Sequence, residues 1–205
     1  MFRQALLLTL VMTFSWSAKA GLILNGSFEG NDVAEGKWKW YTADKVQGWQ
    51  GSNIEIWDNL FQFDSFDGSQ HIELNSHGSN SADPFSIYQT FATVVGQTYE
   101  LSFAYSARKS NDEAFSVALV DSFAQSLLFD LIDDHTRKQW SVYEHTFTAT
   151  SDYTTLRFTS VTPTTRTVGN LIDAVNVTEV SEPKSIALLT LVMAALFSRK
   201  RLFRK

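Results

Sequence analysis

The stretch Gly96-Gln97-Thr98-Tyr99-Glu100-Leu101-Ser102-Phe103-Ala104-Tyr105-Ser106 decides the fold class of this 205-residue chain. From Tyr99 to Tyr105 every second side chain is large and apolar, and the side chains between them are polar or small. Successive side chains of a strand point to opposite faces of its sheet, so this alternation predicts a half-buried β-strand. Residues 95–97 contain a glycine and are expected to form the turn of a hairpin that joins this strand to the preceding one.

Similar segments recur on both sides of this strand, separated by clusters of Gly, Asn, Asp and Ser. The expected strands are residues 22–28, 53–57, 70–75, 86–93, 98–106, 114–120, 140–150, 154–160 and 171–179. Residues 121–134 have some helical character, and we favour a strand and a loop there. Short strands with turns between them predict an all-β fold, a β-sandwich. Its core is expected to contain Tyr99, Leu101, Phe103, Phe115, Val117 and Leu156.

The composition excludes several classes of function. The chain has no cysteine, which rules out disulfides and thiolate zinc sites. Its four histidines show no ligand spacing, which makes a zinc enzyme a poor candidate. The net charge is −5, and seven of the cations lie in residues 1–20 and 199–205, so the region between them is more acidic still. An acidic domain lacks the basic footprint that nucleic acid requires.

The N-terminal residues 1–20 are predicted to be a secretory signal peptide. One cation at Arg3 precedes an apolar run from Ala5 to Trp16. Ala18-Lys19-Ala20 then fits the small-x-small rule for cleavage, so the mature chain should begin at Gly21. A buried first helix is the alternative. The folded domain is expected to occupy residues 21–180.

The C-terminal residues 181–205 are predicted to be a sorting or anchor segment. Ser181-Glu182-Pro183 precedes an apolar run over residues 185–197, and the cations Arg199, Lys200 and Arg201 follow. Positive charge after an apolar helix keeps that end in the cytoplasm, with the folded domain outside.

This tail resembles the PEP-CTERM sorting signal of Gram-negative bacteria, with Ser181 in place of the first proline. The resemblance implies export through the inner membrane by the secretion machinery and handling by an exosortase-type transpeptidase. The protein would then reside at the cell surface or outside the cell, anchored transiently or permanently. An ordinary C-terminal membrane anchor is the alternative.

Five motifs in order along residues 22–179 resemble the DUF642 and choice-of-anchor exported domains. They are Asn25-Gly26-Ser27-Phe28-Glu29, Gln47-Gly48-Trp49, Asp67-Gly68-Ser69-Gln70-His71-Ile72-Glu73-Leu74, Tyr88-Gln89-Thr90-Phe91 with the stretch that opens at Gly96, and Leu171-Ile172-Asp173-Ala174-Val175. The resemblance implies a galactose-binding-like jelly roll related to carbohydrate-binding modules.

Asp173 is the most unusual candidate residue. It alternates with Leu171, Val175 and Val177, so it is expected to point inward, where a carboxylate needs a partner. In the jelly rolls that the chain resembles, a closing-strand Asp and the Glu of the opening motif help to hold a structural Ca²⁺, which implies Asp173 and Glu29 here. Calcium takes six to eight oxygen ligands, so backbone carbonyls would have to contribute. An Asp173 that points to the sheet edge and is hydrogen-bonded to a turn is the alternative.

A second set of residues could contact sugar, because carbohydrate binding uses aromatic faces and polar groups that bond hydroxyls. Glu55 and Trp57 share one strand face, and His71 and Glu73 share another, opposite Ile72 and Leu74. Alternatively, the aromatic residues pack in the core or at its rim, and a core position is especially expected of Tyr105. The ligand candidates are Trp49, Glu55, Trp57, His71, Glu73 and Arg108.

The sequence thus predicts an exported, non-catalytic protein that binds extracellular polysaccharide. A structural biofilm or surface protein without a small-ligand site is the alternative, and a polysaccharide hydrolase that uses Glu55, Glu73 or Asp67 is a third. No G-x-S-x-G elbow is present.

Overall fold

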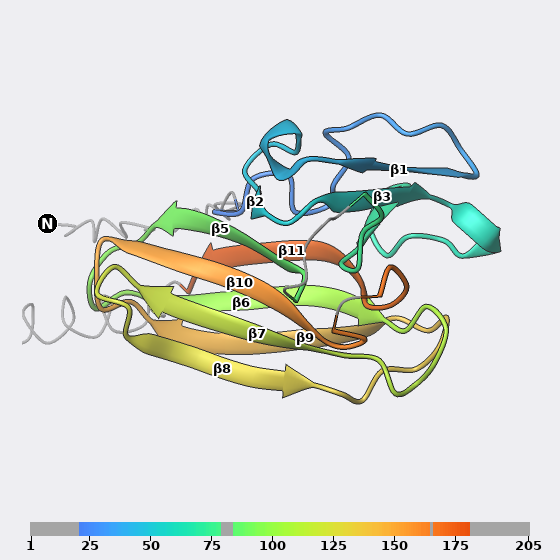
Figure 1. The fold of residues 1–205 in the computed structure, drawn as a ribbon. Helices are drawn as coiled ribbons and strands as arrows, with labels where there is room; N and C mark the ends of the chain where they lie inside the picture. Colours follow the sequence, from blue (N-terminus) through green and yellow to red (C-terminus); the bar gives the residue numbers. More distant parts are fainter. Residues whose placement is uncertain (1–20, 79–83, 165, 181–205) are drawn as a thin grey trace, which may run out of the picture.

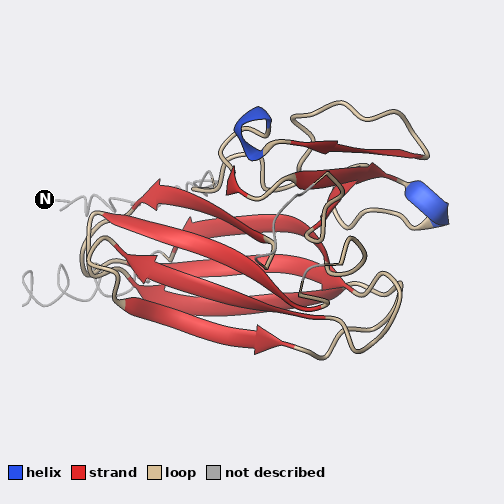
Figure 2. Ribbon diagram, viewed as in Figure 1, coloured by secondary structure: helices blue, strands red, loops and turns tan. Residues whose placement is uncertain are grey.

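The computed structural model describes residues 21–78, 84–164 and 166–180. These residues form eleven strands and two short 3₁₀ helices, η1 and η2 (Figures 1 and 2). The elements are β1 (Lys37–Tyr41), η1 (Ala43–Lys45), β2 (Gln50–Gly51), β3 (Ile54–Asp58), η2 (Leu60–Gln62), β4 (Gln70–Glu73), β5 (Ser86–Ala92), β6 (Thr98–Ser106), β7 (Ala114–Asp121), β8 (Ser126–Ile132), β9 (Ser141–Thr148), β10 (Tyr153–Thr162) and β11 (Leu171–Glu179).

Two antiparallel sheets face each other as a sandwich. The six-stranded sheet has the order β1-β3-β4-β11-β6-β9, and the five-stranded sheet has the order β2-β5-β10-β7-β8. Large apolar side chains from the inner faces of both sheets fill the space between them, including Ile72 and Phe103 from one sheet and Phe115 and Phe158 from the other. Burial of this apolar surface is the main favourable contribution to folding.

The predicted all-β sandwich and its core are confirmed. Phe103 is 1% exposed, and its ring contacts those of Tyr105, Phe115, Tyr143 and Phe158. The other predicted core residues, Tyr99, Leu101, Phe115, Val117 and Leu156, are also buried. The bounds of β6 and β11 match the predicted strands, and a strand, β8, with a loop occupies residues 121–134.

The predicted hairpin at residues 95–97 is wrong. β5 and β6 belong to different sheets, so this turn carries the chain from one sheet to the other. Gly96 has a φ of 82° there, which glycine adopts at no steric cost. Its N–H donates to the carbonyl of Ala149 in the neighbouring turn. A turn signal and two flanking apolar strands do not distinguish a hairpin from such a corner.

The predicted strand at residues 22–28 is also wrong, because this segment forms consecutive turns. Asn25 and Phe28 have positive φ angles of 51° and 59°, which are incompatible with a strand. Conversely, β1 and β2 were not expected. β1 is an edge strand with alternating Lys and Trp side chains, most of them exposed.

The predicted signal peptide at 1–20 and the sorting segment at 181–205 lie outside the described residues. Among the residues that the structure describes, no helix has the length and apolar character to cross a bilayer.

Candidate binding site

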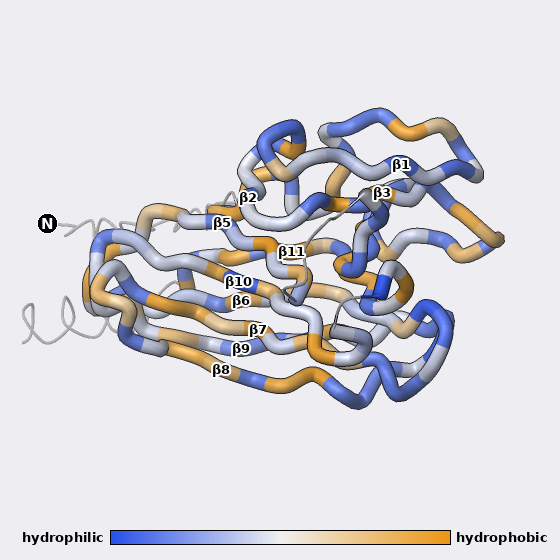
Figure 3. Tube along the Cα trace, in the orientation of Figure 1, coloured by the Kyte–Doolittle hydropathy of each residue, from blue (hydrophilic) through white to orange (hydrophobic). Residues whose placement is uncertain are grey.

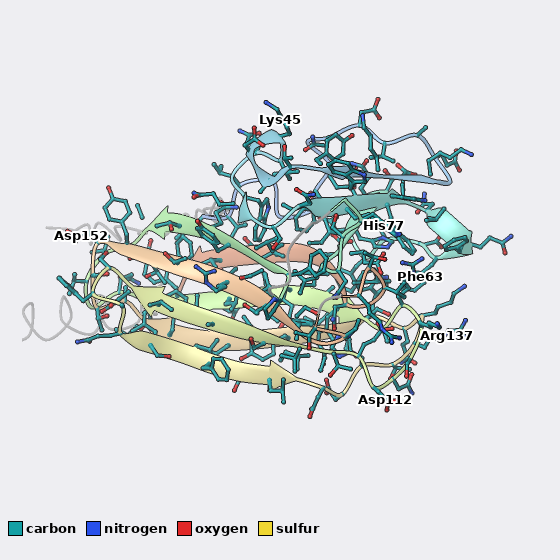
Figure 4. All side chains as sticks on the ribbon, viewed as in Figure 1. Lys45, Phe63, His77, Asp112, Arg137 and Asp152 are labelled. Atoms are coloured by element: carbon teal, nitrogen blue, oxygen red, sulfur yellow. The ribbon has the colours of Figure 1, made fainter. Side chains whose placement is uncertain are left out.

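Three loops lie at one end of the sandwich, on the right in Figure 1, and they join β6 to β7, β8 to β9 and β10 to β11. The segment between β3 and β4, which contains η2, lies beside them. Hydrophilic residues are frequent in the loops that join β6 to β7 and β8 to β9 (Figure 3). His77, Phe63, Asp112 and Arg137 all lie at this end, and Asp152 lies at the other (Figure 4).

Strand register sets the polar candidates beside one another on the outer face of the six-stranded sheet. Glu55 of β3 is directly opposite Glu73 of β4, and Trp57 is directly opposite His71. Their inward neighbours, such as Ile56 and Ile72, pack in the core. All four outward side chains are nevertheless buried, because the loops at this end cover them.

Arg108 connects Glu73 to Trp57. Its Nη1 donates to both carboxylate oxygens of Glu73, at 2.8 and 2.6 Å, and its guanidinium lies 4.6 Å from the centre of the Trp57 ring. Gly169 N–H donates to the same carboxylate at 2.6 Å. Burial raises the pKa of Glu73 to about 8, although Arg108 acts in the opposite direction. The ion pair and the cation–π contact fix Arg108 over the indole ring.

Glu55 fixes the other side of Trp57. The indole N–H of Trp57 donates to Glu55 Oε1 at 2.8 Å. The second oxygen, Oε2, accepts the backbone N–H of His77 at 2.9 Å and lies 2.6 Å from its Nδ1. The His77 ring in turn packs against Trp38, with 4.8 Å between ring centres. Trp57 is therefore oriented by two buried carboxylates, one through its N–H and one through Arg108.

His71 supports the loop between β3 and β4. It is fully buried, its Nδ1 lies 2.8 Å from Ser65 Oγ, and burial lowers its pKa to about 3, so the ring is neutral. Its ring packs against those of Trp57, Phe63 and Trp140. Phe63 stacks on Trp140, and the indole N–H of Trp140 donates to Asp64 O at 2.9 Å. These contacts set the position of η2 and the residues after it.

A pocket of about 460 Å³ opens above Trp57. We call it the Trp57 pocket, and it is lined by Trp57, Phe61, Phe63, Arg108, Lys109, Arg137, Lys138, Val168 and Leu171. Trp57 and Leu171 are buried and form its floor, whereas Phe61 is 61% exposed. The pocket combines aromatic and aliphatic surface with four cationic side chains, which suits a ligand with both an apolar face and polar groups.

Backbone contacts lock the two loops that carry these cations. Ala107 and Arg137 form a parallel bridge, and Lys138 N–H donates to Ala107 O at 3.0 Å. The carboxylate of Glu113 accepts the N–H groups of Arg108 and Lys109, both at 2.7 Å. Glu113 also accepts the N–H groups of Ser110 and Asn170. One buried carboxylate thus holds the cationic loop against the start of β11.

Glu29 and Asp173 hold a single loop from its two ends. Asp173 is buried, but on the outer face and not toward the core as expected, because β11 bulges between Asp173 and Asn176. Its carboxylate accepts the N–H groups of Phe66, Asp67 and Ala174 at 2.6–2.9 Å. Glu29 Oε1 accepts the N–H groups of Ser69 and Gln70 at 2.8 and 2.7 Å. Gly68 has a φ of 67°, and a Cβ there would lie 2.4 Å from that oxygen, so a larger residue would strain the backbone and displace the Glu29 carboxylate.

The bonds to Phe66 and Asp67 match one half of the alternative, an Asp173 bonded to a turn, but Asp173 is buried in a central strand and not at the sheet edge. No cluster of three or more His, Cys, Asp or Glu side chains suited to a metal ion occurs in the described part of the chain. Calcium would therefore draw most of its ligands from carbonyl groups and water, and the Ca²⁺ site at Glu29 and Asp173 stays a prediction.

The structure brings five of the six predicted ligand residues together and separates the sixth. Trp57 and Arg108 line the pocket, and Glu55, His71 and Glu73 lie behind it. Trp49 lies in the core, stacked on Phe28, and takes no part in the pocket. Tyr105 is also buried, as the core alternative predicted.

The sequence reasoning missed Phe61, Phe63, Lys109, Arg137, Lys138 and Val168. The sequence does contain a signal for the cations. The dipeptide Arg-Lys occurs twice in an acidic domain, at residues 108–109 after an expected strand and at residues 137–138 after an expected loop. No comparable signal marks Phe61.

The comparisons with known proteins identify the family. A family model described as "Protein of unknown function (DUF642)" matches residues 21–178, and the chain belongs to this family. The chain is also 30% identical over 171 residues to halomucin from Haloquadratum walsbyi (strain DSM 16790 / HBSQ001). The match covers 79% of this chain but only 2% of halomucin, so the chain spans a small part of that relative.

Two solved structures share the fold. TmCBM61, solved in complex with β-1,4-galactotriose, is 12% identical with a TM-score of 0.51, and the match covers 78% of this chain and 99% of TmCBM61. The arabinose-bound α-L-arabinofuranosidase MgGH51 is 13% identical with a TM-score of 0.52, covering 78% of this chain and 26% of that enzyme. These likenesses confirm the predicted jelly-roll β-sandwich fold.

Proposed function

We propose that this protein binds carbohydrate at the Trp57 pocket. The observation that carries the proposal is the pocket itself, an opening of about 460 Å³ in which an exposed ring, Phe61, lies beside charged hydrogen-bond donors. Sugars present an apolar face that packs on aromatic rings and hydroxyls that need donors and acceptors. The shared fold with TmCBM61, solved with a galactotriose, agrees with this function.

The binding function is proposed to be non-catalytic. A glycosidase needs two carboxyl groups that flank the scissile bond. Glu55 and Glu73 are neighbours, but they are 1% and 0% exposed and are already bonded to Trp57, His77, Arg108 and Gly169. Their contacts favour a role in positioning the pocket over a role in bond cleavage.

The protein is further proposed to act outside the cell, on extracellular polysaccharide. This part rests on the predicted signal at residues 1–20, the Ser181-Glu182-Pro183 motif and the basic end at 199–201. N-terminal sequencing of protein exported by a Gram-negative host should start at Gly21. Replacing Arg199, Lys200 and Arg201 with Glu should impair membrane retention and processing by an exosortase-type enzyme. Exported protein that retains Met1, or unchanged fractionation of the variant, would contradict these two statements.

Titration calorimetry against a panel of neutral and acidic oligosaccharides, β-1,4-galactotriose among them, tests the binding function. At least one oligosaccharide should bind saturably, and Phe61→Ala should weaken that binding by tenfold or more. Phe129→Ala is the matched control, because Phe129 on β8 is 68% exposed and does not line the pocket. If no oligosaccharide binds, the alternative of a structural surface protein is favoured.

A further inference from the structure

The positive charge of the domain is concentrated at the Trp57 pocket. Residues 21–180 contain nine Lys and Arg against 21 Asp and Glu. Four of those nine cations, Arg108, Lys109, Arg137 and Lys138, line this one pocket, and no carboxylate of the described residues lines it. An even distribution over an acidic surface would not place nearly half of the cations around a single opening.

Three of these four cations have no ion-pair partner among the residues that the structure describes. Arg108 is paired with Glu73. Across residues 21–78, 84–164 and 166–180, no carboxylate forms an ion pair with Lys109, Arg137 or Lys138. Lys138 Nζ donates only to a backbone carbonyl, that of Phe61, at 3.3 Å. Glu113, the nearest buried acid on the same loop, is bonded to backbone N–H groups.

Two residues that line the pocket, Phe61 and Lys138, have an unusual backbone conformation. Phe61 and Lys138 have φ angles of 56° and 54°, in the left-handed region that residues with a Cβ adopt rarely. Such conformations cost free energy and gather at ligand sites, where the surrounding structure holds them. Here both residues line the pocket, and Lys138 Nζ donates to the backbone carbonyl of Phe61.

We propose that the Trp57 pocket binds a hexuronate unit of an acidic polysaccharide. This inference rests on the proposed carbohydrate-binding function and names the class of sugar. The sugar ring would pack on Phe61, and its carboxylate would accept hydrogen bonds from Lys109, Arg137 or Lys138. Bonds between a carboxylate and a cationic donor are about twice as strong as neutral ones, so the carboxylate provides discrimination against neutral sugars.

The acidic surface outside the pocket also limits where an acidic polysaccharide can bind. A strongly acidic domain repels a polyanion everywhere except at a local concentration of positive charge. The pocket is therefore suited to one or two uronate units and not to a long run of anionic contacts. Association should depend on ionic strength, because exposed charges are screened over about 10 Å at 0.1 M salt.

The test compares acidic oligosaccharides with their own methyl esters, which keep the sugar stereochemistry and remove the charge. Oligogalacturonate, oligoglucuronate and alginate oligomers, each with its esterified form, and neutral β-1,4-galactotriose are titrated into the purified protein. We expect at least one acid to bind tenfold or more tightly than its ester, and the difference to shrink at 0.5 M salt.

Two triple variants of equal net charge localise the effect. Lys109→Gln/Arg137→Gln/Lys138→Gln should weaken binding of the acid by tenfold or more. Lys37→Gln/Lys39→Gln/Lys45→Gln, away from the pocket, should change it by less than twofold. Equal melting temperatures for the two triple variants would show that the pocket variant is folded. If the pocket triple variant does not fold, Lys109→Gln alone is used, and it should also weaken binding of the acid.

Each other outcome overturns a distinct statement. Esters or galactotriose that bind as tightly as the acids would contradict the uronate preference and leave carbohydrate binding intact. Equal losses in the two triples would contradict the assignment to this pocket. Absence of binding by every oligosaccharide would contradict both the inference and the proposed function.

Discussion

Glu55 and Glu73 lie directly opposite each other on neighbouring strands, and both are buried. Like charges in such positions are destabilising unless each has its own partner. Glu55 is bonded to Trp57 and His77, and Glu73 is bonded to Arg108 and Gly169. Because both sets of bonds converge on Trp57, the carboxylate pair fixes the floor of the pocket.

Removing the partner of Glu73 should destabilise the fold. Arg108→Gln removes the cation that pairs with Glu73, and breaking such a buried pair costs roughly 3–5 kcal/mol where the carboxyl group is ionised. Urea denaturation at about pH 9, above the Glu73 pKa of about 8, measures the loss. Lys45→Gln is the control, since Lys45 pairs only with exposed Asp44 and should change stability by less than about 0.5 kcal/mol. Equal stabilities for the two variants would show that the ion pair does not support the pocket.

Phe103 should contribute strongly to stability because it lies between the sheets. Phe103→Ala removes a ring that is 1% exposed and should cost roughly 3–5 kcal/mol. Phe129→Ala removes a ring that is 68% exposed and should cost far less. Denaturant melts of both variants measure the difference. A loss below about 1 kcal/mol for Phe103→Ala would contradict the assigned core.

Stability in the absence of calcium should depend on the protonation of Asp173. Burial raises the pKa of Asp173 to about 7, outweighing its three backbone N–H donors. Its folded-state pKa lies above the unfolded value, so the folded state binds the extra proton. The stabilisation is complete below about pH 4 and is lost as the pH rises through 7, with a slope of at most about 1.4 kcal/mol per pH unit.

Asp173→Asn should flatten that decline, measured by denaturation at a series of pH values in chelator. Asp152→Asn, in an exposed turn at the other end of the sandwich, should keep the wild-type slope (Figure 4). A variant at Asp173 with the wild-type slope would show that another group titrates.

Calcium, if it binds at Glu29 and Asp173, should stabilise the domain. A ligand that binds only the folded state adds about 2.7 kcal/mol at 100 times its dissociation constant. Chelator should lower the melting temperature by several degrees, added Ca²⁺ should restore it, and Asp173→Asn should abolish most of the response. Metal analysis must first show that the chelated sample is free of metal. Identical melting curves in chelator and in millimolar calcium would then contradict a calcium site, and both carboxylates would serve only to bind the turn.

The strands and the core could be predicted because they depend on local alternation. Tyr99, Leu101 and Phe103 show their burial in their spacing, and the pairing of Glu55 with Trp57 on one face follows from the same period. The inward position expected for Asp173 is wrong, because a β-bulge between Asp173 and Asn176 shifts the alternation: Ile172 and Val175 face the core, and Asp173 is buried on the outer face. Period-two patterns contain no information on which strands pair, and for this reason residues 95–97 were expected to form a hairpin.

The pocket could be predicted only in part, because loops build it. Trp57 could be predicted because it lies on an expected strand, and Arg108 because it follows the end of one; both line the pocket. Phe61 and Lys138 belong to loops far apart in sequence, and their contact depends on left-handed backbone conformations that the residue types do not favour. Trp49 was expected at the ligand because it is aromatic and near a turn, but its ring fills the core beside Phe28.

The most direct test of carbohydrate binding at the Trp57 pocket is an NMR titration of the ¹⁵N-labelled protein with an oligosaccharide that binds. Tryptophan-to-phenylalanine variants assign the indole N–H signals. Binding at the pocket predicts saturable shifts of the Trp57 indole N–H and of the Lys109 and Lys138 amides, with the Trp49 indole N–H unchanged. Shifts confined to the indoles of Trp38 and Trp40, which lie on the edge strand β1, would place the sugar elsewhere and contradict the account.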